Sequence, residues 1–132
     1  MIVSAAFPGG LWYANEQKLG LFELVPSLYP RFIFTLYPTN NGGIFIRADT
    51  NMRVGSEQGK DNYVINVNRP WDGPWELWQI EPIPGNPGRV ALRSYFGRYA
   101  SATGMFKPIN AAATKVGPNE QFILSASLGN GS

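Results

Sequence analysis

The chain has 132 residues and a formal net charge of +2, and it contains neither Cys nor His. This length suits one domain with its own core. The missing residue types exclude disulfides, thiolate nucleophiles, imidazole bases and metal sites built on Cys or His. The small net charge, with 11 Lys and Arg spread along the chain, gives no reason to expect nucleic acid as a partner.

The composition also indicates the fold class. Gly and Pro number 15 and 11, aromatic residues make up 14% of the chain, and charged residues make up only 15%. A chain that is rich in turn formers and aromatic residues but poor in charge is typical of an all-β domain with many turns.

The sequence predicts neither membrane insertion nor secretion by a classical signal. No segment reaches the ~20 apolar residues that span a bilayer. The N-terminus has no basic segment before its apolar residues, and Pro8-Gly9-Gly10 interrupts them, which argues against a signal peptide. We therefore expect a protein that is cytoplasmic, or released without a classical signal peptide.

Short apolar runs between Gly, Pro or Asn residues predict strands along the whole chain. Residues 40–43 (Asn-Asn-Gly-Gly) favour a hairpin turn, because Asn and Gly tolerate positive φ angles. Residues 82–88 contain three prolines and predict a surface connection. In chain order the predicted strands cover residues 11–14, 31–37, 44–48, 63–67, 77–80, 89–93, 98–102 and 121–124.

An internal repeat organises these strands. Each of three segments ends in a strand with an aromatic residue, at Phe22, Trp78 or Phe122, and an aliphatic residue two positions later. The period of two places both side chains on one face of the strand, toward the core. We place the repeats at about residues 1–29, 30–87 and 88–132 of a single domain.

This alignment leaves the first repeat 12 residues short, because Phe22 and Trp78 are 56 residues apart whereas Trp78 and Phe122 are 44 apart. Either the opening strand of that repeat is absent, or the register is wrong there and residues 2–5 are the opening strand. An absent strand would expose a sheet edge that invites pairing. The tail at residues 125–128 or a neighbouring subunit would then cover the edge, so this arrangement favours a homo-oligomer.

Three quasi-repeats of about 44 residues, each with four strands, form the plan of a β-trefoil. The sequences GPWELW at residues 73–78, VALRS at 90–94 and GRYASA at 97–102 resemble the fascin-like branch of the β-trefoils. The resemblance is strong over residues 73–124 and weak over 25–72. It implies an all-β fold with pseudo-three-fold symmetry, and because its motifs describe the scaffold it says little about function.

The most polar stretch, residues 49–75, contains a candidate binding site. A sugar ring stacks its C–H face on an aromatic ring and pairs its hydroxyls with carboxylates or carboxamides. Trp71, Asp72 and Asn62 supply these groups, so we predict a carbohydrate site in this stretch. Two smaller candidates follow the same logic, and they consist of Tyr13, Asn15 and Glu16 in the first repeat and of Tyr95, Arg98 and Thr103 in the third.

Structural explanations compete with each of these sites. Trp78 and Trp75 are expected in the core, and Trp71 then caps the open end of the barrel. The two smaller clusters are, on this alternative, ordinary solvated turns. The sequence leaves both explanations open.

Catalysis is not expected. Without His, hydrolysis would need two carboxylates at a suitable separation. The two close pairs, Glu57 with Asp61 and Asp72 with Glu76, lie in predicted exposed turns where neither pKa would shift. No nucleotide-binding, calcium-binding or nucleophile motif occurs. We therefore predict no catalytic residues, no cofactor and no metal.

These observations favour a small β-trefoil lectin, which binds a glycan or glycoprotein without catalysis. The sugar would stack on Trp71 or Tyr13, with hydrogen bonds from Asp72, Asn62 and Asn15, and with Arg98 as a further contact. A single shallow site binds a sugar weakly, so useful binding would need several sites at once.

The alternative is a trefoil that binds protein. A fascin-like actin binder would use a positive face formed by Arg89, Arg93 and Arg98, if these side chains point outward. A protease inhibitor would present the loop at residues 50–70. A single copy of the fold would have to oligomerise before it could bundle filaments.

Overall fold

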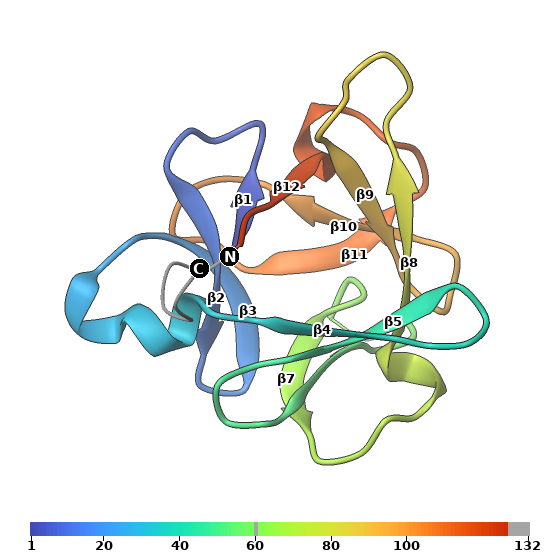
Figure 1. The fold of residues 1–132 in the computed structure, drawn as a ribbon, viewed down its shortest axis with the longest axis horizontal. Helices are drawn as coiled ribbons and strands as arrows, with labels where there is room; N and C mark the ends of the chain where they lie inside the picture. The colour runs from blue at the N-terminus through green and yellow to red at the C-terminus, as the bar shows by residue number, and fades with distance from the viewer. Residues whose placement is uncertain (60, 127–132) are drawn as a thin grey trace.

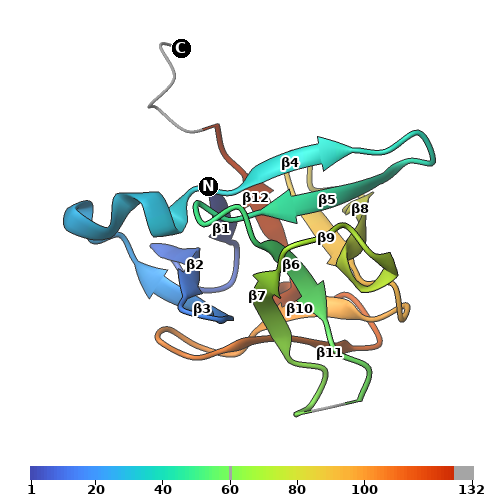
Figure 2. The ribbon, with the colours of Figure 1, turned by 90° about the horizontal axis from the view of Figure 1, so that it is seen from below.

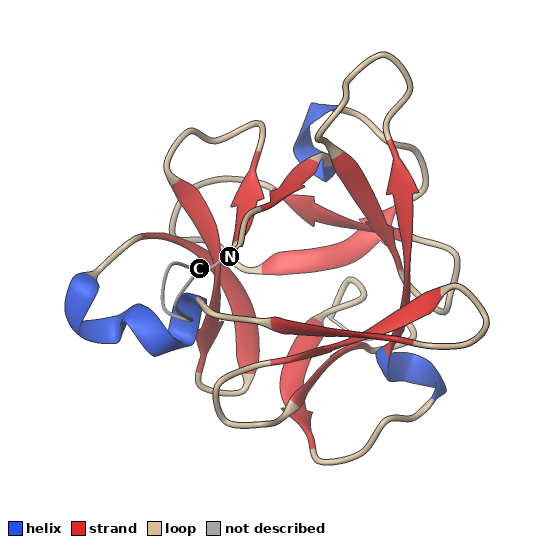
Figure 3. Cartoon of the chain, viewed as in Figure 1, coloured by secondary structure: helices blue, strands red, loops and turns tan. Residues whose placement is uncertain are grey.

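The computed structural model describes residues 1–59 and 61–126, which form twelve strands and three short 3₁₀ helices. Figure 3 shows the three helices on the outside of the strand framework. The first elements are β1 (Ile2–Ser4), β2 (Gly10–Asn15), β3 (Lys18–Glu23), η1 (Pro26–Phe32) and β4 (Thr35–Pro38). Next come β5 (Gly43–Arg47), β6 (Arg53–Ser56), β7 (Ile65–Arg69), η2 (Pro74–Glu76) and β8 (Leu77–Pro82). The last are β9 (Val90–Arg93), β10 (Tyr99–Ala102), β11 (Ile109–Ala113), η3 (Pro118–Glu120) and β12 (Phe122–Leu124).

Strand pairing groups the chain into three units of four strands, β1–β4, β5–β8 and β9–β12. In each unit the second and third strands form a hairpin, β2 with β3, β6 with β7 and β10 with β11. The fourth strand of each unit pairs with the first strand of the next, β4 with β5, β8 with β9, and β12 with β1. Figures 1 and 2 both place β1 beside β12, where the ring closes. This is the strand plan of a β-trefoil, so the predicted fold class is confirmed.

The predicted alignment of the first repeat is wrong. Phe22 lies in β3, inside a hairpin, where it pairs with Leu11. The counterpart of Trp78 and Phe122 is Phe34, which immediately precedes β4, and all three rings are buried. From 34 to 78 and from 78 to 122 is 44 residues in each case. The first unit is therefore full length, and the division expected at residue 29 moves beyond β4.

A proline turn marks each repeat just before these buried rings. The backbone N–H of the residue three positions on donates to the proline carbonyl, and this turn directs the chain into the last strand of the unit. The three prolines are Pro30, Pro74 and Pro118. Of the two alternatives for the first repeat, the second is confirmed, because β1 lies within residues 2–5 and pairs with both β12 and β2. The tail expected to cover an open edge extends to residues 127 and 128, which lie outside the described residues.

The three repeats place core side chains at equivalent positions, but these side chains differ in size. Strand registers make Trp12, Val54 and Ala100 equivalent, and none of the three is exposed. The Trp12 ring occupies the volume that the two smaller side chains leave, since a close-packed core fixes the total volume rather than each residue. It lies edge-on to Phe34 and Phe122, with ring centroids 6.1 and 5.6 Å apart.

The three hairpins interlock through their loops. Each hairpin's second strand donates a backbone N–H to a loop carbonyl of another hairpin, from Val67 to Gln17, from Ala111 to Tyr63 and from Leu21 to Lys107, at 2.8, 2.9 and 3.1 Å. In each loop the residue just before the accepting carbonyl has a left-handed backbone, and these residues are Glu16, Asn62 and Phe106, with φ of 58°, 58° and 64°. The ring of hydrogen bonds therefore fixes three equivalent tip positions.

Candidate functional site

Exposed aromatic rings gather where η2 meets the turn between β9 and β10. The Trp75 ring lies 5.7 Å from the Phe96 ring, and the Phe96 ring lies 5.4 Å from Tyr95 and 6.5 Å from Tyr63, measured between centroids. Tyr95 is 56% exposed and Trp75 is 37% exposed. Exposed aromatic residues in mutual contact indicate a binding surface, whereas isolated ones need no explanation.

Trp71 extends this cluster. It is 57% exposed, and together with Trp75 and Arg69 it lines a shallow depression of about 250 Å³. The Trp71 ring lies close over Gly73, since a Cβ placed on Gly73 would be 3.4 Å from Trp71 Cδ1 and 2.8 Å from Glu76 Oε1. Glycine at position 73 thus lets the loop close under the ring. We call Tyr63, Trp71, Trp75, Tyr95 and Phe96 the aromatic patch.

Two arginines hold the aromatic patch in place. The guanidinium of Arg69 lies 5.7 Å from the Trp75 ring centroid and donates to Glu57 Oε1 at 2.7 Å. The guanidinium of Arg98 lies 4.4 Å from the Tyr63 ring centroid and donates to the Ala112 carbonyl at 3.0 Å. A cation over an aromatic face is attracted by the ring's electrons. Both rings are therefore oriented before any ligand arrives.

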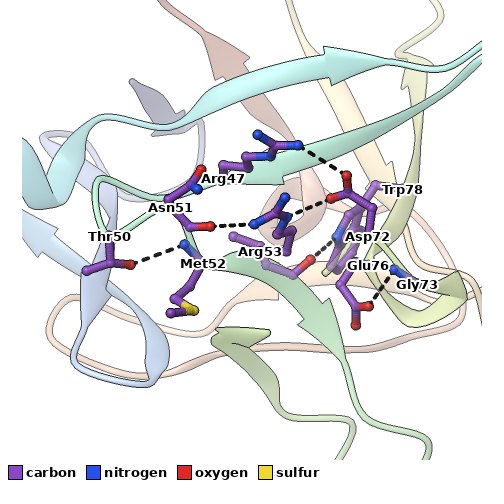
Figure 4. Close-up of polar contacts among 10 residues, drawn as sticks. Arg47, Thr50, Asn51, Met52, Arg53, Asp72, Gly73, Glu76 and Trp78 are labelled. Atoms are coloured by element: carbon purple, nitrogen blue, oxygen red, sulfur yellow. Dashed lines mark hydrogen bonds and ion pairs between the residues drawn. The ribbon is translucent and has the colours of Figure 1, made fainter. Parts of the chain in front are cut away.

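Asp72 follows Trp71 but does not line the depression. Figure 4 shows its carboxylate between two guanidinium groups, with Arg53 Nε donating at 2.8 Å and Arg47 Nη2 at 3.1 Å. Partial burial alone would raise the pKa of Asp72, but the hydrogen bonds and charges of Arg53 and Arg47 outweigh it and hold that pKa below its usual value. Arg47 in turn lies over the Tyr37 ring, 4.1 Å from its centroid. Asp72 is therefore held in an ion-pair cluster with Arg47 and Arg53, beside the aromatic patch.

Glu76 is a structural carboxylate. It is buried, and its Oε1 accepts the Gly73 N–H at 2.9 Å. Burial raises the pKa of Glu76 above its usual value. Asp72 is exposed as expected, but Glu76 is not, and the expectation that both pKa values are unshifted is wrong. Within residues 1–59 and 61–126, no group of three or more acidic side chains gathers in a way that would hold a metal ion.

The prediction that Tyr13 offers a ring for sugar stacking is wrong. Tyr13 is buried in β2, with its ring 4.5 Å from that of Phe22 and 4.8 Å from that of Phe32. Its hydroxyl accepts a hydrogen bond from Arg31 at 3.2 Å. The Tyr13 ring is therefore in contact with two other rings, because β2 turns this side chain toward η1.

The structure brings together residues that the sequence places in two separate sites. Trp71 comes from the polar insert and Tyr95 and Arg98 come from the third repeat, yet all three belong to or adjoin the aromatic patch. Asn62 is exposed at its hairpin tip, next to Tyr63. Asn15 is exposed at the end of β2 and lines a different groove, with Phe22 and Phe106.

Sequence reasoning missed two features of the patch. Trp78 is buried, as the structural alternative expected, but Trp75, which the same alternative places in the core, is partly exposed. Phe96, which joins Trp75 to Tyr95, belongs to none of the predicted sites. The sequence does contain a local signal, because a turn with two consecutive aromatic residues followed by Gly97 has few ways to bury both rings.

The basic face predicted around β9 does not form as a free surface. Arg93 lies 3.6 Å from Glu81, and Arg89 donates to the Gln121 side chain at 3.3 Å. Arg98 is occupied by Tyr63 and Ala112. Each of the three cations thus has a partner inside the protein, although Arg93 stays largely exposed.

No protein-family model and no curated protein sequence matches the chain. Solved structures do match it. The designed three-fold symmetric protein ThreeFoil has a TM-score of 0.81 at 13% identity and covers 96% of both chains. SeviL bound to asialo-GM1 saccharide has a TM-score of 0.74 at 19% identity, over 92% of this chain and 91% of its own. The BEL β-trefoil has a TM-score of 0.75 at 12% identity, over 92% and 88%.

At these identities the likeness shows the fold alone, and that fold is the β-trefoil. In the part of the chain that the structure describes, no helix is long and apolar enough to cross a membrane. Because the fold does not determine function, the function of the site has to be inferred from its own residues.

Proposed function

We propose that the protein binds carbohydrate at the aromatic patch, without catalysis. The observation that carries this proposal is the pair Trp71 and Trp75, which line one depression while 57% and 37% exposed. Large aromatic side chains are usually buried when nothing binds them. Flat rings at a shallow, open depression suit the C–H faces of a pyranose.

Polar groups for sugar hydroxyls surround these rings. Arg69 lines the depression, and its planar guanidinium is fixed by Glu57. Asn62 and Tyr95 offer an amide and a phenol at the edge of the patch. Prealigned polar groups lose little entropy on binding, which matters for a ligand as weakly held as a sugar.

The β-trefoil fold is consistent with this proposal but does not carry it. SeviL is bound to asialo-GM1 saccharide, which gives one example of a sugar-binding protein with this fold. At 19% identity that ligand cannot be transferred. The proposal therefore leaves the sugar open.

A glycan array tests the proposal directly. We expect the wild-type protein to bind a subset of glycans and Trp71→Ala and Tyr95→Ala to lose about tenfold or more of that signal, as expected for loss of a stacked ring. Leu24→Ala is the matched control, because Leu24 is 44% exposed outside the patch. Equal binding by Trp71→Ala and wild type, with both proteins folded, would reject the site.

A protein ligand is the second candidate, and one observation favours it. The patch combines Trp, Tyr and Arg, the residue types that dominate protein-binding hot spots. Co-sedimentation with actin filaments and inhibition of a panel of proteases would test the two partners that the sequence suggested. Loss of either activity in Trp71→Ala, with an empty glycan array, would favour protein over sugar.

A further inference from the structure

A larger groove lies away from the aromatic patch, between the tip of the β2–β3 hairpin and the loop that joins β10 to β11. Its volume is about 730 Å³, against about 250 Å³ for the depression at Trp71. Phe22 and Phe106 supply its apolar surface, and their rings meet edge-on with centroids 5.5 Å apart. Among the residues that the structure describes, none lines both the groove and the depression.

Phe106 occupies a costly position in this groove. Its φ of 64° places a bulky residue in the left-handed region, which is unfavourable for a residue with a Cβ. The equivalent tip position in the second repeat holds Asn62, a residue that tolerates this backbone. Phe106 is also 61% exposed, so burial recovers little of the cost. Strain that packing does not repay is typical of functional positions.

The polar lining of the groove is cationic and rich in amides. Lys18 and Lys107 line it together with Glu16, which leaves one net positive charge. Over residues 1–59 and 61–126, neither lysine has a carboxylate within the 4.0 Å of an ion pair. Asn15 and Gln17 add exposed carboxamides that suit hydroxyl groups.

We propose that this groove is a second saccharide site and that it takes an acidic sugar. The pyranose ring lies on Phe106, the sugar carboxylate faces the ammonium groups of Lys18 and Lys107, and the carboxamides of Asn15 and Gln17 pair with hydroxyls. A neutral sugar would leave the two cations unpaired, and a simple anion would leave the Phe106 ring exposed. The inference rests on the proposed function only in assigning a sugar as the ligand, because the groove and the patch share no residue.

Titration of ¹⁵N-labelled protein tests the site, with sodium glucuronate as the probe and glucose and sodium acetate as comparisons at equal ionic strength. We expect glucuronate to shift the Gly20 and Lys107 amides, and glucose and acetate to bind at least about threefold more weakly. Lys18→Gln combined with Lys107→Gln should abolish the preference for glucuronate over glucose. Lys115→Gln, which changes an exposed lysine outside the groove, should leave that preference intact.

Phe106→Asn provides the sharpest variant. It should weaken glucuronate binding by about tenfold while keeping or raising the melting temperature, because Asn relieves the left-handed strain. A lower melting temperature would show that Phe106 serves packing against Phe22 and would overturn the inference. Equal shifts with acetate, or equal affinity for glucose, would overturn it as well.

The test separates this inference from the proposed function. Trp71→Ala should leave the glucuronate titration unchanged, and Phe106→Asn should leave glycan-array binding at the aromatic patch unchanged. Failure of glucuronate to shift any groove amide would reject the groove alone. An array signal that is insensitive to Trp71→Ala would reject the patch alone.

Discussion

The first repeat differs from the other two at one pair of equivalent positions, one on the hairpin and one in the proline turn. Strand register and the proline turns make Tyr13, Gly55 and Ser101 equivalent on the hairpins, and Phe32, Glu76 and Glu120 equivalent in the turns. In the first repeat the two positions hold rings, and the Tyr13 and Phe32 centroids lie 4.8 Å apart. In the other repeats a carboxylate occupies the turn position.

The two turn carboxylates, Glu76 and Glu120, need hydrogen-bond donors and space around them that the rings of the first repeat do not need. Glu76 accepts the Gly73 N–H at 2.9 Å, and its Oε2 lies 2.6 Å from where a Cβ on Gly55 would be, so glycine is required there by space. Glu120 accepts the Gly117 N–H at 2.8 Å and also the hydroxyl of Ser101. The difference teaches that the three-fold scaffold preserves volume and position, while each repeat satisfies its own polar groups.

The largest effect on stability should come from the contact between Tyr13 and Phe32 in the first repeat. Phe32→Ala should destabilise the protein by about 3–5 kcal/mol, because Phe32 is fully buried and its removal leaves a cavity beside Tyr13. Urea unfolding measures the change. Tyr37→Ala is the control, since Tyr37 is 41% exposed and should change stability by less than about 1 kcal/mol. Similar losses in both variants would mean that the ring pair has no special share in stability.

This comparison also explains how far the sequence could lead. The period of two in short strands and the motifs of the third repeat were sufficient for the β-trefoil. The alignment of the first repeat failed because Phe32 stands where Glu76 and Glu120 stand, so the motif that marks the other turns is absent. The spacing of Pro30, Pro74 and Pro118 carried the correct register, since proline fixes the turn regardless of the neighbouring chemistry.

The candidate site was less accessible to sequence reasoning. Trp71 and Arg98 were named, but their association depends on η2 packing near the β9–β10 turn, a contact between different repeats. Tyr13 was misplaced for a simpler reason. In β2 both faces of the strand are buried from Gly10 to Ala14, because η1 covers the side that would otherwise meet solvent, and alternation alone does not reveal such a cover.

A medium effect on stability is expected in the third repeat, where the Glu120 carboxylate accepts a hydrogen bond from the Ser101 side chain. Ser101→Ala removes the hydroxyl donor to Glu120 and should cost about 1–3 kcal/mol, the range for a buried group that loses its partner. The matched change in the first repeat is Tyr13→Phe, which removes only the hydroxyl that accepts from Arg31 and should cost about 0.5–1 kcal/mol. Thermal and urea unfolding of both variants compare them. A larger loss in Tyr13→Phe would reverse the contrast between the repeats.

The smallest effect should be a change in pH dependence. Burial raises the pKa of Glu76 above its ordinary 4.5, so the folded state favours the protonated form. The resulting stability is fully present below that pH and is lost as the pH rises through the folded-state pKa. Glu76→Gln keeps an acceptor for the Gly73 N–H and should remove this decline, which unfolding free energies measured between pH 3 and 8 would show as a flatter curve.

Asp72→Asn should alter the acidic end of the curve of unfolding free energy against pH. The two arginines hold the pKa of Asp72 below its ordinary 3.8, against the opposing effect of partial burial, so its contribution is present above that pH and is lost on acidification. The Asn variant should therefore lack part of the acid-side loss while keeping the decline toward neutral pH. If Glu76→Gln and wild type gave parallel curves above pH 4.5, Glu76 would not be the titrating group. The carboxylate in the second repeat would then be as insensitive to pH as the ring pair in the first.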